Sequence, residues 1–119
     1  MHYWEEFFTY ICATLDQPRA EVEARILSKL KVMVKSILRL FENEFHLPGA
    51  TSITGWDVIF DKDLNPWMME INPKPDMRME MSHMSHFKIP LVSEAVDLSL
   101  RLAKGEEPPQ TYGSFVYLN

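Results

Sequence analysis

Hydrophobic and polar residues follow a helical period over the first third of the chain. Over residues 1–15, apolar side chains recur every three or four positions, which predicts a short amphipathic helix. Over residues 19–44, a second apolar stripe lies beside a side rich in lysine and arginine, which predicts the longest helix. Between the two, Asp16-Gln17-Pro18 is expected to end the first helix and cap the second.

The period changes to two in the middle of the chain. Two short runs, residues 56–60 and 67–71, are rich in aromatic and β-branched side chains. They flank a cluster of Asp, Lys, Asn and Pro, which are typical turn residues. This arrangement predicts an antiparallel β-hairpin.

Folding the chain about this turn places Asp57 opposite Glu70. The same register places Phe60 opposite Trp67. Side chains alternate along a strand, so Asn72 shares a face with Glu70. The other face is expected to pack against the helices, with the core candidates Trp56, Val58, Phe60, Trp67, Met69 and Ile71.

The C-terminal part of the chain predicts one more helix and a tail. Residues 89–104 are apolar at helical spacing, with Pro90 at the start of the helix and Gly105 at its end. The aromatic tail either docks on a sheet or stays apart. We therefore expect an α/β (α+β) fold with a helical segment (residues 1–47), a hairpin (51–75), a loop with the closing helix (76–105) and a tail (106–119).

Composition narrows the class of protein. The 119 residues suffice for one domain or part of one, and 46% apolar with 24% charged residues is ordinary for a soluble globular protein. A net charge of −5 argues against a general nucleic-acid binder. A single cysteine excludes an internal disulfide, and there is no apolar run of membrane-spanning length and no signal-peptide pattern, so we expect a cytoplasmic protein.

The three polar residues on one hairpin face suggest a metal site. Asp57 and Glu70 would repel each other across the strands, and a divalent cation would remove that repulsion. Two carboxylates and the amide oxygen of Asn72 suit magnesium, which is usually held by carboxylates together with substrate phosphates. The alternative is the solvated side of an amphipathic hairpin, and spacing alone leaves both interpretations open.

Three other patterns suggest sites more weakly. Asp61, Asp63 and Asn65 imitate the start of an EF-hand loop, but Pro66 stands where that loop needs glycine, so we reject calcium binding of this type. Met and His residues between 77 and 86 suggest either copper(I) binding or methionine packing against the core. The basic side of the long helix either binds an acidic partner or is simply solvated.

The hairpin also resembles a known family. Gly55-Trp56-Asp57 and the later run from Pro66 to Pro75 (PWMMEINPKP) resemble the "GxD" strand and the "PWLLEVNxxP" segment of tubulin–tyrosine ligases and their relatives. The resemblance implies the C-terminal lobe of an ATP-grasp fold, with the whole chain as a partial domain of that kind. It further implies Asp57, Glu70 and Asn72 as magnesium ligands, and Glu70, Asn72 and Lys74 in contact with ATP. Residues 51–54 depart from the acidic segment that family members usually carry there.

The resemblance implies an ATP-dependent ligase that joins tyrosine, glutamate or glycine to tubulin or another acidic protein tail through an acyl phosphate. Its setting would be the cytoplasm and the microtubule cytoskeleton or cilium. Because the family's nucleotide-clamping lysines belong to an upstream lobe, and no glycine-rich phosphate loop occurs here, we expect this chain alone to bind Mg-ATP weakly and not to ligate. The alternatives are an inactive interaction module for an acidic partner, or another ATP-grasp carboxylate–amine ligase.

Overall fold

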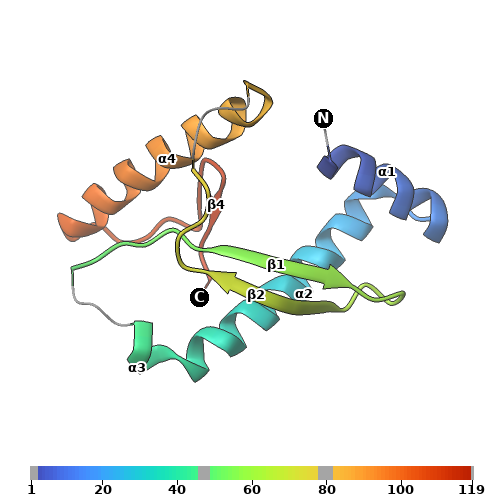
Figure 1. The fold of residues 1–119 in the computed structure, drawn as a ribbon, viewed down its shortest axis with the longest axis horizontal. Helices are drawn as coiled ribbons and strands as arrows, with labels where there is room; N and C mark the ends of the chain where they lie inside the picture. Colours follow the sequence, from blue (N-terminus) through green and yellow to red (C-terminus); the bar gives the residue numbers. More distant parts are fainter. Residues whose placement is uncertain (1–2, 46–48, 78–81, 119) are drawn as a thin grey trace. The chain divides into compact units, whose positions relative to one another are not determined.

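The computed structural model describes residues 3–45, 49–77 and 82–118, with the backbone alone at Tyr3, at Phe45 and over 82–87 (Figure 1). The chain divides into two compact units. The first comprises Met1–His46 and Gly55–Asn72, and the second Leu47–Thr54 and Pro73–Asn119. Each unit is described by itself.

The first unit begins with helices α1 (Tyr3–Leu15) and α2 (Arg19–Leu40). The expected break between them is present, but the expected side-chain cap is wrong, because Pro18 stands at the N-cap and has no side chain that could accept a hydrogen bond. Its carbonyl accepts the amides of Glu21 and Val22 instead. The long helix also stops earlier than predicted: Phe41 leaves the helical conformation, and the short α3 (Glu42–Phe45) follows.

The hairpin consists of β1 (Gly55–Phe60) and β2 (Pro66–Asn72), and α2 packs against β2 (Figure 1). Phe8, Val22 and Ile26 of the two helices are almost completely buried. Leu64 joins them from the hairpin turn at 2% exposure, even though its φ of 58° is in the left-handed region that non-glycine residues rarely adopt. Burying such a side chain contributes about 1.5–3 kcal/mol, which outweighs a left-handed cost of about 1–2 kcal/mol.

The predicted register holds at the far end of the hairpin and fails near the turn. Asp57 lies opposite Glu70 as expected, but Phe60 lies opposite Pro66 and not Trp67. The difference is a β-bulge: Met69 is an extra residue in β2, and both Met69 and Glu70 oppose Asp57.

The bulge changes which side chains face the helices. Trp56, Val58, Phe60 and Ile71 are half-buried as predicted. The prediction that Trp67 and Met69 are core residues is wrong, since they are 61% and 64% exposed. Pro66 and Met68 take the inward places, because Phe60 pairs with Pro66 and the alternation starts one residue earlier than expected.

The second unit contains α4 (Ser82–Ala103) and a small hairpin of β3 (Thr111–Tyr112) and β4 (Phe115–Val116). The closing helix therefore starts seven residues before the predicted position, and Pro90 lies inside it and not at its start. The tail docks on α4. The amide of Ser114 donates to the Glu94 carboxylate over 2.8 Å, and the Tyr112 hydroxyl donates to Asp97.

Helices with small antiparallel sheets make this an α+β fold, as predicted. Met77 is half-buried, and the rest of the Met/His stretch, for which copper(I) binding or methionine packing was expected, lies outside the described residues and side chains. Among the described helices, none is long and apolar enough to cross a membrane.

Candidate functional site

The open face of the β1–β2 hairpin carries the predicted metal ligands. Asp57 and Glu70 are directly paired across the strands, and Gly55 pairs with Asn72 at the end of the same ladder. All three polar side chains are exposed, while Trp56, Val58 and Phe60 of β1 line a groove with α1 and α2. The helices therefore pack on the face opposite the three polar residues, as the sequence predicted.

Two carboxylates in directly opposed positions have Cβ atoms about 4.5–5.5 Å apart, and like charges at that separation destabilise a sheet. A cation between them would reverse the sign of this interaction. Over the described residues, no group of three or more His, Cys, Asp or Glu side chains is placed to hold a metal. The arrangement seen here is two carboxylates plus an amide, so it fits a site that needs further oxygen ligands from a phosphate.

Three apolar side chains lie beside the acidic pair on the same face, toward the hairpin turn. Ile59 pairs with Trp67, and Met69 is the bulge residue beside Glu70. Ile59 is 55% exposed and, like the exposed Trp67 and Met69, presents apolar surface to solvent. Sequence reasoning missed this patch because it assigned Trp67 and Met69 to the core. A contiguous apolar patch beside charged groups is a common mark of a ligand site.

The turn between the strands is built around one carboxylate. Asp61 accepts the backbone amides of Asp63 and Asn65 and the side-chain amide of Asn65, each over 2.9 Å. The Trp67 indole N–H is a fourth donor at 3.3 Å. These hydrogen bonds, those of Asn65 foremost, lower the pKa of Asp61 to about 2.

The same turn is tied to α2. The Lys29 ammonium donates to the Asp63 carbonyl over 2.8 Å and to the Asn65 side-chain oxygen over 2.7 Å. The sequence predicted a hairpin turn at these residues and rejected a calcium loop, but it did not predict the hydrogen bonds of Asp61 that close the turn. The signal that could have found them is the Asx-turn spacing, in which an Asp side chain accepts the amide two residues on.

The remaining predicted residues are distributed as follows. Lys74 is exposed and belongs to the second unit, so its contact with ATP stays a prediction. On the basic side of α2, Lys29 is engaged by the turn, whereas Lys31 and Arg39 are exposed. Exposed apolar residues lie on the same helix, among them Val32 and Leu40.

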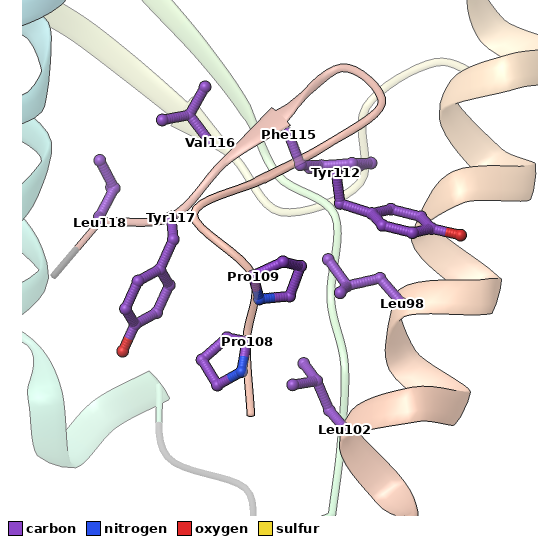
Figure 2. Close-up of a pocket in the computed structure, with 9 residues that line it drawn as sticks. All are labelled: Leu98, Leu102, Pro108, Pro109, Tyr112, Phe115, Val116, Tyr117 and Leu118. Atoms are coloured by element: carbon purple, nitrogen blue, oxygen red, sulfur yellow. The ribbon is translucent and has the colours of Figure 1, made fainter. Parts of the chain in front are cut away.

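The second unit contains a separate apolar pocket of about 280 Å³ (Figure 2). Leu98 and Leu102 of α4 form one wall, and prolines and aromatic side chains of the tail form the other. Tyr112 links the pocket to a polar network, since its hydroxyl binds Asp97 and the Arg101 guanidinium lies 5.3 Å from its ring centre.

Comparison with protein-family models identifies the family to which the chain belongs. The tubulin-tyrosine ligase family matches residues 18–108, which is most of the chain. This chain belongs to that family. The resemblance seen in the hairpin is thereby confirmed and extends over α2 and α4, while α1 and the β3–β4 hairpin lie outside the match.

Membership gives a coarse description of the molecule. The family is ATP-grasp-like, and the chain is an ATP-dependent ligase-like domain. Searches of curated proteins and of solved structures return no significant match.

Proposed function

We propose that this tubulin-tyrosine ligase family domain supplies a magnesium and ATP site to an ATP-dependent ligase that attaches an amino acid to a protein. The observation that carries the proposal is the cross-strand pair of Asp57 and Glu70 on the open hairpin face, with Asn72 at the end of the same strand. An exposed acidic pair is costly without a counter-ion, and it adjoins an apolar patch.

The residues present suit the cofactors in kind. Asp57, Glu70 and Asn72 would offer hard oxygen donors to magnesium, and phosphate and water would supply the remaining ligands. When bound, the metal neutralises phosphate charge and orients the transfer. Lys74 follows Asn72 by two residues and carries a positive charge, and it is proposed to contact a phosphate.

The apolar patch of Ile59, Trp67 and Met69 would receive the flat, apolar part of the nucleotide. Their exposed surface lies on the face that also presents Glu70, so one ligand with a base at one end and phosphates at the other matches both.

The proposed reaction has two steps. A substrate carboxylate takes the γ-phosphoryl group to give an acyl phosphate and ADP, and an amine then displaces phosphate to form the amide.

The proposed protein substrate is an acidic tail, of tubulin or of another protein, and the amino acid is tyrosine, glutamate or glycine. Exposed Lys31 and Arg39 on α2 support an acidic partner by charge. A tubulin substrate would place the protein in the cytoplasm at the microtubule cytoskeleton.

The experiment is a calorimetric titration of the 119-residue chain with ATP in magnesium and in EDTA. We expect magnesium-dependent binding that weakens at least tenfold in Glu70→Gln, because the variant removes a charged oxygen ligand. Glu21→Gln, which removes an exposed acid from the first turn of α2, is the matched control and should bind as the native chain does. Equal binding with and without magnesium would refute the metal site.

A second candidate function is an interaction module without ligase chemistry. The observation that favours it is α2, where exposed basic residues alternate with the exposed apolar Val32 and Leu40. Lys31→Glu combined with Arg39→Glu should abolish binding to an acidic peptide in this case. The native chain should then bind no Mg-ATP, and this separates the module from the ligase domain, which needs Mg-ATP and binds an acidic tail through the same basic residues.

A further inference from the structure

The proposed metal site depends on strand register, and the register is set in the hairpin turn. Near the turn Phe60 pairs with Pro66, and the strands then run in phase to the bulge at Met69. A slip of one residue moves every side chain of a strand to the opposite face. Glu70 would then point toward the helices, away from Asp57.

One carboxylate closes this turn. Asp61 accepts donors from three different residues, so it fixes both the length and the path of the loop. Its backbone adds two further links, because its amide donates to the Asn65 carbonyl over 3.1 Å and its carbonyl accepts the Leu64 amide over 3.0 Å. Replacing Asp61 would remove four acceptor contacts in one step.

The closed turn is also anchored to the body of the first unit. Leu64 is buried among α1 and α2, and Lys29 of α2 binds two oxygens of the loop. The turn therefore cannot slide along β2 without withdrawing Leu64 from the core. The contact from the Trp67 indole further holds a side chain of the open face to the same carboxylate.

We infer that Asp61 is a positioning residue for the proposed magnesium site: it closes the turn that brings Glu70 opposite Asp57 and holds Trp67 on the same face. The effect on metal binding rests on the proposed function, whereas the effect on strand register rests only on the hydrogen bonds of the turn. Asp61 itself is not among the proposed metal ligands.

The test compares Asp61→Ala with the neighbouring Asp63→Ala in the 119-residue chain. The Asp63 carboxylate is exposed and lies 4.0 Å from the Lys62 ammonium, so its loss is the matched control. Two NMR measurements are made: cross-strand NOEs between the backbones of Asp57 and Glu70, and line broadening of the Glu70 amide by Mn²⁺, a paramagnetic substitute for magnesium.

In Asp61→Ala we expect the Asp57–Glu70 NOEs to disappear and Mn²⁺ to bind at least tenfold more weakly, with native chemical shifts retained along α1 and α2. Asp63→Ala should match the native chain in both measurements. Native NOEs and native Mn²⁺ affinity in Asp61→Ala would overturn the inference.

Two further arms keep the test decisive. If Asp61→Ala does not fold, Asp61→Asn replaces it, since its amide oxygen can accept the Asp63 and Asn65 backbone amides. The inference then requires native NOEs in Asp61→Asn and also in Trp67→Phe combined with Lys29→Met, which removes the outer ties and leaves the Asp63 and Asn65 contacts of Asp61 in place. Loss of the NOEs in that double variant would show that the outer ties set the register, and would overturn the inference. If Mn²⁺ leaves the native Glu70 amide unaffected, the proposed function fails, and the NOEs alone still decide whether Asp61 sets the register.

Discussion

The two hairpins of this protein close their turns in opposite ways. In β1–β2 the turn is closed from within, because Asp61 accepts hydrogen bonds from residues of its own loop. In β3–β4 the turn is closed from outside, because Glu94 of α4 accepts the Ser114 amide. In the first turn, residues of the loop itself fix the strand register, whereas the second turn depends on a residue of α4 that lies about twenty positions earlier in the chain.

The two closures also use the left-handed conformation differently. In the first turn the residue with positive φ is Leu64, and burial of its side chain in the core offsets the cost of this conformation. In the second it is Gly113, whose missing side chain leaves room for the Glu94 carboxylate. A bulky residue is required at one position and excluded at the other.

The largest effect is expected from Leu64→Ala. The substitution leaves a cavity among Phe8, Val22 and Ile26, and should lower the free energy of unfolding of the first unit by about 3 kcal/mol. Denaturant titration followed by tryptophan fluorescence is a suitable measurement, because all three tryptophans belong to this unit. A loss below about 1 kcal/mol would mean that the turn is not anchored by its leucine.

Gly113→Ala should release the β3–β4 hairpin from α4. The new methyl group would collide with the Glu94 carboxylate, and φ at this position is 54°. We expect about 1–2 kcal/mol less protection of the Ser114 amide in hydrogen exchange. Gly105→Ala is the control, since it shares a positive φ but meets open space, so the difference between the variants measures the collision.

The two closures should also respond differently to pH. The pKa of Asp61 is lowered to about 2 from its ordinary value of 3.8, so its stabilisation is complete above that value and is lost as the pH falls toward 2. NMR of the Trp67 indole between about pH 5 and about pH 1, roughly one unit beyond each pKa, would follow this loss. An unchanged indole signal in folded protein at the acid end would contradict it.

The tail hairpin should weaken at both ends of the pH scale. The Tyr112 hydroxyl lowers the pKa of Asp97, so this contact is lost in acid. The same bond raises the pKa of Tyr112 above 10.0, so the stabilisation is present below that value and is lost as the pH rises through the raised pKa. Tyr112→Phe should abolish the alkaline loss of Ser114 protection, and Tyr117→Phe should not.

The smallest effect is expected from Lys62→Ala. Its ion pair with Asp63 is long at 4.0 Å and both side chains are largely exposed, so the free energy of unfolding should change by less than about 0.5 kcal/mol. A larger change would show that the first turn depends on surface charge and not on Asp61.

The contrast between the hairpins explains how much the sequence predicted. Local patterns were sufficient for α1, for β1–β2 and for the pairing of Asp57 with Glu70, since each rests on neighbouring residues. The bulge at Met69 was not predicted, because alternation alone cannot show which residue is extra. Nor could local rules find Pro90 inside a helix, since they place proline at a helix start. Local patterns could not predict the docking of the tail, because its contacts are with α4.

Because of the bulge, β2 contains one residue more than a regular ladder with β1 requires. A single deletion between the turn and Glu70 would straighten the ladder, and Glu70 would take the outward place that Met69 now occupies beside it. A single insertion could not be accommodated in this way, because the strand already contains one extra residue at the bulge. Glu70 would then turn inward. Changes of chain length at this strand should therefore be tolerated in one direction only.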